Sequence, residues 1–288
     1  MEKSDAFIAE ALFRTEALKP APADQPFWYT SGTLGPYFIN THYLFGGAER
    51  AGELLAAINR ALEGPRTELP LKVGSLCMAE YQENANYRRI IDVACEKLKA
   101  LEFDAVSGGE RRDYFFSFAV AENMQLPHIT LFKDKAGVWT DLHFKAPKTL
   151  ASGALQGKKV LHVADLVTEA SSYLRAWLPA LRDFGAGITE TLAVVDRSQG
   201  GREILAKEGV ELLSLIELDE AFFREAEAKE QITPEQCEGI LRFREDPHAY
   251  MQKFLAGHPD FIAQELAKGG KSEERARRAI KEGYAEAP

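Results

Sequence analysis

Apolar positions in the middle of the chain recur with two spacings. Apolar residues three and four positions apart predict helices at 52–64, 87–103, 112–126 and 171–185. In the second of these helices the stripe consists of Ile90, Ile91, Ala94, Leu98 and Leu101. Short apolar runs predict strands at 103–109, 128–132, 158–165 and 188–197. This alternation predicts an α/β fold with a parallel sheet flanked by helices.

The two ends of the chain break this alternation. An amphipathic helix near the N-terminus precedes the aromatic-rich segment 27–40, in which glycines and a proline predict short strands around turns. After about Leu218 the pattern is helical, in short pieces separated by prolines, and the charged segment 271–288 predicts a solvated terminal helix. We therefore expect an N-terminal segment at 1–45, an α/β core at 46–218 and a helical extension at 219–288.

The composition mainly excludes classes of protein and of binding partner. The 288 residues carry a net charge of −9, with 45% hydrophobic and 27% charged residues, which argues for a globular protein and against general nucleic-acid binding. No apolar run could span a bilayer, and the acidic N-terminus lacks a cleavage-site pattern, so we expect no membrane association. Cys77, Cys95 and Cys237 are far apart and odd in number, which predicts reduced thiols and a cytoplasmic protein.

The turn at 106–113 carries residues suited to a phosphorylated ligand. Ligands of open parallel sheets gather where strands end and helices begin. Gly108 and Gly109 would let the backbone approach such a ligand, and Arg111 and Arg112 offer cationic donors to phosphate oxygens. The alternative is a tight strand-to-helix turn that binds nothing.

The segment 160–172 carries a second candidate. Asp165 follows an apolar strand directly, where a carboxylate accepts hydrogen bonds from sugar hydroxyls or helps to hold a metal. Thr168, Ser171 and Ser172 add hydroxyl groups at the start of a helix. Helix capping by the same residues is the alternative, and the two explanations are compatible because phosphate-binding loops also cap helices.

Other features favour structural roles. The turn at 194–203 places Asp196 and Arg197 at the end of a strand, and we expect an ion pair that closes the edge of the site. The six histidines lack metal-ligand spacing, and His162, inside a strand, is expected in the core. The absence of G-x-S-x-G, Walker A and G-x-G-x-x-G patterns leaves hydrolase, P-loop and Rossmann functions without support.

Four stretches in this order resemble the orotate phosphoribosyltransferases, a family of type I phosphoribosyltransferases. Segment 27–40 is similar to the family's base-binding hood, and 105–113 lies where the family has its pyrophosphate-binding turn. Segment 160–172 matches the signature loop that holds ribose 5-phosphate, and 192–218 matches the Asp-Arg-x-x-Gly-Gly segment and final strand. The resemblance covers roughly residues 27–45 and 103–218.

The resemblance implies transfer of a phosphoribosyl group from phosphoribosyl pyrophosphate (PRPP) to a pyrimidine-like base, orotate above all. It implies magnesium bound with PRPP, no metal held by the protein alone, and a homodimer. The catalytic residues it implies are Asp165, Lys133 and Lys135. The PRPP-binding residues it implies are Ser107, Gly108, Gly109, Arg111, Thr168, Ser171 and Ser172, and the base-binding residues are Ser31, Gly32, Tyr37 and Phe38.

The chain departs from the family pattern at three places. Ala164 replaces the first of two acids, and Phe132 stands at an arginine position in a shortened catalytic loop. Glu169 and Ala170 replace threonine and glycine in the signature turn. One lost electrostatic donor typically costs about 10²–10³ in rate, so three hypotheses remain. The chain is an active transferase, or it is a weak or inactive member that binds a nucleotide or phosphorylated sugar in a regulatory role. The third hypothesis is that the turns have a purely structural origin.

Overall fold

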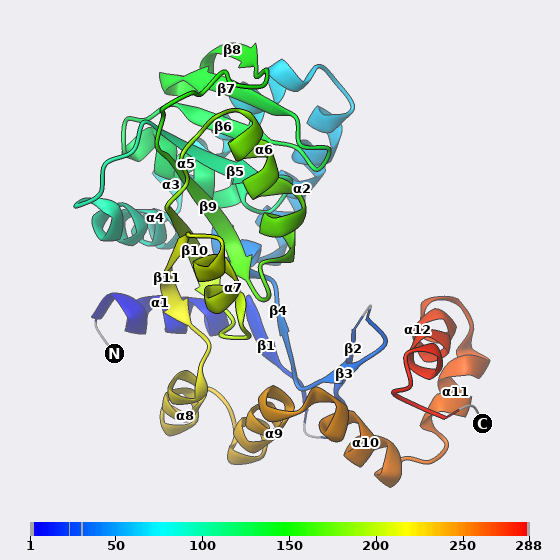
Figure 1. The fold of residues 1–288 in the computed structure, drawn as a ribbon. Helices are drawn as coiled ribbons and strands as arrows, with labels where there is room; N and C mark the ends of the chain where they lie inside the picture. Colours follow the sequence, from blue (N-terminus) through cyan, green and yellow to red (C-terminus); the bar gives the residue numbers. More distant parts are fainter. Residues whose placement is uncertain (1–2, 23, 30, 287–288) are drawn as a thin grey trace. The chain divides into compact units, whose positions relative to one another are not determined.

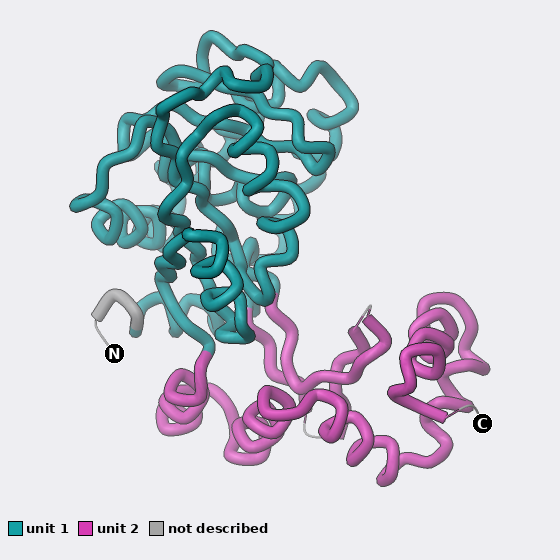
Figure 2. The backbone as a smooth tube through the Cα atoms, in the orientation of Figure 1, with its two compact units in different colours: residues 1–17, 40–218 teal, residues 18–39, 219–288 magenta. Residues whose placement is uncertain are grey.

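The computed structural model describes residues 3–22, 24–29 and 31–286, with side chains from residue 6 onward. It divides into two compact units (Figure 2). Unit 1 comprises residues 1–17 and 40–218, and unit 2 comprises residues 18–39 and 219–288. The chain thus leaves unit 1 after the first helix, returns to it at residue 40, and leaves it again at the end of the α/β region.

Unit 1 is built on a seven-stranded sheet (Figure 1). Its strands are β5 (Ala105–Gly109), β6 (His128–Leu131), β7 (Gly137–Asp141), β8 (Lys145–Thr149), β9 (Val160–Val167), β10 (Glu190–Asp196) and β11 (Glu211–Glu217). In the order β11-β10-β9-β5-β6-β7-β8 the first five are parallel, and the last two pair antiparallel. The α/β fold class predicted from the sequence is confirmed.

Helices of unit 1 cover this sheet. They are α1 (Lys3–Arg14), α2 (Gly47–Leu62), α3 (Leu69–Glu83), α4 (Ala85–Leu98), α5 (Tyr114–Asn123), α6 (Leu178–Asp183) and α7 (Gly201–Lys207). Shorter helical segments are η1 (Thr41–Phe45), η2 (Arg66–Glu68), η3 (Leu142–Phe144) and the π-helical η4 (Tyr173–Trp177). Pro179 occupies the first turn of α6, where its missing N–H is tolerated, and the turn before it is π-helical.

The carboxyl end of β5 has helices on both faces. A Cβ atom on Gly108 would overlap the Ser117 side chain of α5, and one on Gly109 would overlap the indole of Trp177 in η4. Successive strand residues point to opposite faces, so α5 and η4 cover opposite sides of the sheet. The glycine pair is required by this packing, which gives the alternative explanation of the turn direct support.

The described residues of unit 2 form two short antiparallel strand pairs and five helices. The strands β1 (Leu18–Pro20) and β4 (Tyr37–Ile39) pair antiparallel, as do β2 (Phe27–Trp28) and β3 (Leu34–Gly35). The helices are α8 (Glu220–Ala228), α9 (Pro234–Glu245), α10 (Pro247–Gly257), α11 (Phe261–Lys268) and α12 (Gly270–Lys281). Leu34 is fully buried with Met251 and Ala279, and Trp28 stacks on Phe261 with ring centroids 4.9 Å apart.

Two helices of unit 2 begin at prolines. Pro234 and Pro247 occupy first turns, after the capping residues Thr233 and Asp246, whose side chains accept hydrogen bonds from the backbone N–H groups of Gln236 and Ala249. In the described part of the chain, no helix combines the length and the apolar character that crossing a membrane requires.

Candidate functional site

A cavity of about 320 Å³ lies at the carboxyl ends of β5 and β9, entirely within unit 1. Its lining residues are Leu55, Glu110, Arg111, Arg112, Asp113, Lys133, Ala164, Asp165, Leu166, Ser172 and Trp177. Three of these side chains are cationic and three are acidic. The structure therefore brings the two candidate turns together at the sheet edge where ligands of such folds bind.

Asp113 joins the two turns. Its Oδ1 accepts a hydrogen bond from the backbone N–H of Asp165 at 3.1 Å, and its Oδ2 accepts one from the N–H of Gly109 at 3.1 Å. Oδ2 also lies 3.4 Å from His162 Nε2, without the alignment of a hydrogen bond. Asp113 was not among the site residues predicted from the sequence. The local sequence shows only an acid directly before a helix, which is typical of a helix cap. The Asp113 side chain instead bonds to the neighbouring strand β9 and does not cap α5.

Asp165 is buried at the floor of the cavity. Its Oδ2 is inaccessible to water and has no hydrogen-bond partner among the described residues. Burial, and after it the negative charge of Asp113, raises the pKa of Asp165 well above its usual range, which Arg112 opposes. The raised pKa favours the neutral form of this carboxyl group, and a cation or hydroxyl donor bound beside it would favour the ionised form.

The three cations of the cavity differ in their partners. Arg111 donates to Asn59 of α2, and Lys133 Nζ lies 3.5 Å from Glu110 Oε1. Arg112 is exposed and forms no ion pair within the part of the chain that the structure describes. Arg112 is therefore the cation with the most freedom to bind an anionic ligand, although the resemblance singled out Arg111.

Ser107 and His162 lie beneath the site. Ser107 is fully buried, with Oγ 2.9 Å from His162 Nδ1, and does not line the cavity. His162 is fully buried, as expected from its place in the strand, and lies against Tyr173 and Trp177. These two residues support the floor of the cavity.

The segment expected to form a catalytic loop is a tight turn between β6 and β7. Phe132 N–H donates to Ala136 O at 2.9 Å and Lys135 N–H to Phe132 O at 2.9 Å, so five residues close the hairpin. Lys133 lines the cavity, whereas Lys135 is exposed and does not.

Phe132 is almost fully buried under Arg66, whose guanidinium carbon lies 4.6 Å from the ring centroid. Arg66 also makes two hydrogen bonds to Asp134, of 3.1 and 2.7 Å. A guanidinium from η2 thus fixes the hairpin at the position where the family pattern has an arginine in the hairpin itself.

The signature turn contains a residue in the left-handed conformation that is not glycine. Ala170 is buried and has φ of +51°, in the left-handed region that favours glycine. Glu169 and Ser171 are exposed and, like the half-buried Thr168, do not line the cavity. Ser172 contributes to the lining. The negative charge of Glu169 is therefore directed to solvent.

The turn after β10 is a structural closure. Asp196 is almost fully buried, accepts from Ser198 N–H at 2.8 Å and pairs with Arg202 at 3.1 Å. A Cβ atom on Gly201 would lie 2.7 Å from Thr168 O, so glycine lets α7 begin against the signature turn. Arg202 of α7 is thus an ion-pair partner of the strand-end acid.

The residues expected to bind the base belong to unit 2. Tyr37 is almost fully buried, with its ring 5.6 Å from that of Phe223, whereas Phe38 is 39% exposed. Ser31 Oγ lies 2.7 Å from Thr33 Oγ1, and a Cβ atom on Gly32 would lie 2.9 Å from Ala279 N in α12. Phe38 is the more accessible of the two aromatic candidates, and α12 packs against the Ser-Gly turn.

The cavity matches a metal that arrives with its ligand. The described residues contain no group of three or more His, Cys, Asp or Glu side chains arranged to hold a metal. Asp165, with its unpartnered oxygen, lies at the cavity floor, and Ala164 stands where the resembled pattern has a second acid. Magnesium in such sites is typically bound by one or two carboxylates together with phosphate oxygens of the substrate, and Asp165 fits that role.

Comparisons of the sequence with known proteins find orotate phosphoribosyltransferases. The chain is 32% identical to that of Staphylothermus marinus over 132 residues, 46% of this chain and 61% of the relative. It is 31% identical to that of Pyrococcus furiosus over 134 residues, 46% of this chain and 69% of the relative. The match to the Halobacterium salinarum protein is 47% identical but spans 34% of it, so several relatives are matched over part of their length. No family model matches the chain.

Solved structures give the same fold. The chain resembles the UMP synthase of Leishmania donovani, with a TM-score of 0.56, 17% identity, and coverage of 83% of this chain and 41% of the other. It also resembles the orotate phosphoribosyltransferase of Francisella tularensis, with a TM-score of 0.52, 15% identity, and coverage of 82% and 96%. At these identities the likeness establishes the fold.

Proposed function

The chain belongs to the orotate phosphoribosyltransferase family, and on this basis we propose that it transfers a phosphoribosyl group from PRPP to a pyrimidine-like base, with orotate as the expected acceptor. The observation that carries the proposal is the cavity at the ends of β5 and β9. There Asp165 lines the same cavity as Arg111, Arg112 and Lys133, and its buried Oδ2 has no hydrogen-bond partner among the described residues. A sugar with a pyrophosphate group matches this combination of acceptor and cations.

The residues have distinct roles in the proposed reaction. Displacement of pyrophosphate from the sugar C1 passes through an oxocarbenium-like state, so catalysis consists of positioning and charge stabilisation. Arg112 and Lys133 bind the pyrophosphate and stabilise the charge that develops on it as it leaves. Asp165 accepts hydrogen bonds from the ribose hydroxyls. Magnesium bound with the pyrophosphate would neutralise further negative charge on the leaving group.

The apolar part of the lining supports this chemistry. Leu55, Leu166 and Trp177 form the apolar part of the lining, beside the charged groups. Electrostatic interactions are stronger where water is excluded, so the cations gain effect from these neighbours. Asp113 is a positioning residue, because it holds the turns of β5 and β9 at a fixed separation.

The test of the proposed function is turnover. Purified protein is incubated with PRPP, magnesium and orotate, and orotidine 5′-phosphate and pyrophosphate are quantified. The two products should form in equal amounts. Uracil and adenine serve as alternative acceptors. Formation of orotidine 5′-phosphate that requires PRPP supports the proposal, and its absence under conditions in which PRPP binds contradicts it.

A second candidate function is binding without turnover. Ala164 in place of an acid and the closed five-residue hairpin at 132–136 both reduce the catalytic equipment of the site. The regulatory alternative therefore predicts saturable binding of PRPP or a nucleotide with no product. The same assay, combined with a binding measurement, separates the two candidates.

A further inference from the structure

We propose that a groove formed by α9 and α10 binds a nucleoside monophosphate, at a site that takes no part in the proposed transfer reaction. The groove belongs to unit 2 and has a volume of about 690 Å³, within the range of small-molecule sites. Its lining residues are Arg242, Glu245, Asp246, Ala249, Tyr250, Lys253 and Phe254. All of them lie within 13 consecutive residues, so one local structure forms the entire site.

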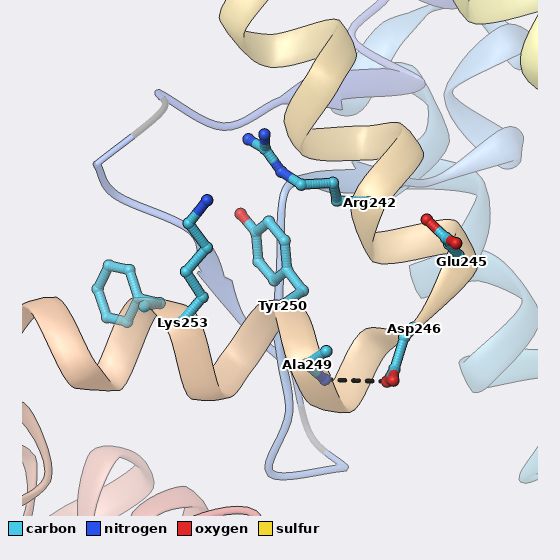
Figure 3. A pocket seen from close by; sticks show the side chains of 7 residues that line it. Arg242, Glu245, Asp246, Ala249, Tyr250 and Lys253 are labelled. Carbon is cyan, nitrogen blue, oxygen red and sulfur yellow. Dashed lines mark hydrogen bonds between the residues drawn. The ribbon is translucent and has the colours of Figure 1, made fainter.

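The junction of the two helices creates the groove. Asp246 ends α9 with an extended backbone and caps α10, accepting a hydrogen bond from Ala249 N–H at 2.9 Å. Figure 3 shows the guanidinium of Arg242, the hydroxyl of Tyr250 and the ammonium of Lys253 directed to the same side of α10. The carboxylate of Glu245 points away from them. The small side chain of Ala249 leaves room between these groups.

Two cationic side chains of the groove have no acidic partner among the described residues. Among the described residues, neither Arg242 nor Lys253 has a carboxylate oxygen within 4 Å, whereas Arg224 of the same unit pairs with Glu220, Glu227 and Glu238. Asp246 is engaged as a cap. Guanidinium groups bind phosphate with two parallel hydrogen bonds, and lysine adds a second positive charge. Tyr250 contributes a hydroxyl donor close enough to Arg242 for the positive charge to lower its pKa against the larger effect of burial.

Aromatic surface adjoins these cations. The rings of Tyr250 and Phe254 are half-buried, and their positions are held by neighbours: Phe243 lies 5.6 Å from Tyr250, and His258 lies 4.2 Å from Phe254. Fixed aromatic rings offer a flat apolar surface to a planar ligand. A phosphate bound by the two cations, joined through a sugar to a planar ring on this aromatic surface, describes a nucleoside monophosphate.

The test is calorimetric titration of the full chain with adenosine 5′-monophosphate, which is neither substrate nor product of the proposed reaction. Adenosine and inorganic phosphate are titrated separately. We expect the nucleotide to bind at least tenfold more tightly than either part. Arg242→Gln and Lys253→Gln should each weaken binding about tenfold or more, and Tyr250→Phe should weaken it less because the ring remains.

Two controls locate the site. Lys271→Gln removes an exposed cation of α12 that does not line the groove and should leave the affinity unchanged. Arg112→Gln removes a cation of the unit 1 cavity and should also leave it unchanged. If Arg112→Gln abolishes binding and Arg242→Gln does not, the nucleotide binds in unit 1 and the groove proposal is wrong. Equal affinity for nucleotide and phosphate, or no nucleotide binding by the wild type, overturns it as well.

Discussion

The carboxylate of Asp113 accepts a hydrogen bond from the backbone N–H of Asp165, at 3.1 Å. Asp113 precedes α5 and Asp165 lies near the end of β9, so one side chain links the two turns that form the cavity. The negative charge of Asp113 also adds to burial in raising the pKa of Asp165. The contact that fixes the shape of the site therefore also favours the neutral form of its central acid.

Asp165→Asn should stabilise the free protein at neutral pH. Because the folded pKa of Asp165 is raised, its contribution to stability is full below the unfolded pKa of about 4 and is lost as pH rises toward the folded pKa. Asparagine cannot ionise and avoids this loss. Between pH 5 and pH 8, the free energy of unfolding measured in urea should decrease less for the variant than for the wild type.

The same substitution should weaken ligand binding. A bound cation or hydroxyl donor should stabilise the ionised form of Asp165, so that ligand binding releases a proton. Titration of the wild type with PRPP and magnesium in two buffers of different ionisation enthalpy will detect this release. The variant should bind more weakly and release fewer protons. Identical affinity and proton release in both proteins would remove Asp165 from the site.

Gly109→Ala should destabilise unit 1. The added methyl would overlap Trp177 and lie 2.8 Å from Asp113 Oδ2, and overpacking of this kind typically costs about 1–3 kcal/mol. Gly52→Ala is the matched control, because a Cβ there meets nothing within 4 Å and alanine in a helix is favoured by up to about 1 kcal/mol. Thermal unfolding should shift in opposite directions for the two variants. A neutral Gly109→Ala would show that the close packing is relieved at little cost.

Acid should destabilise the protein through His128. Burial, and after it the charge of His162, lowers the pKa of His128 to about 3, so its contribution to stability is present above pH 6.5 and is lost as pH falls toward 3. One such group changes the free energy of unfolding by up to about 1.4 kcal/mol per pH unit. Between pH 4 and 7, the free energy of unfolding in urea should depend less steeply on pH for His128→Gln than for the protein with His128. Both proteins should carry Asp165→Asn, which removes the opposite effect of that acid.

The signature turn should tolerate its unusual residues. Ala170→Gly relieves a left-handed alanine by about 1–2 kcal/mol, but it removes a buried methyl worth about 0.8 kcal/mol and adds flexibility to the unfolded chain. The net change in stability should stay within about 1 kcal/mol.

Glu169→Thr should leave PRPP affinity within about twofold, because the exposed Glu169 does not line the cavity. A gain of tenfold or more would show that its charge reaches the ligand.

Local pattern was sufficient to predict the strands and helices around the site. The apolar runs at 103–109 and 158–165 became β5 and β9, and the order of turns placed Asp165 and Arg111 on one cavity. Strand β8 was missed because all five of its residues are exposed and no apolar alternation marks it. Helix α3 was missed because Leu71 and Leu76 face solvent and interrupt its buried stripe.

Contacts between distant residues could not be predicted from local pattern. Asp113 bonds to a strand 52 positions later, and Arg66 reaches Asp134 across 68 positions. The left-handed conformation of Ala170 does not follow from local pattern either, since alanine ordinarily avoids it; the resemblance alone marked this position, as one where the family has glycine. In each case the tertiary fold, rather than the neighbouring sequence, determines the conformation or the partner.

Titration of PRPP with magnesium into the wild type and Arg112→Gln tests the central claim most directly, that the unit 1 cavity is the phosphoribosyl site. Arg112 is exposed and makes no ion pair with the described residues, so its loss should leave the fold intact. Lys97→Gln is the control, as it removes an exposed cation that does not line the cavity. We expect saturable binding by the wild type and the control, weakened at least tenfold in Arg112→Gln. Equal affinities in all three proteins, or no binding by the wild type, would contradict the account.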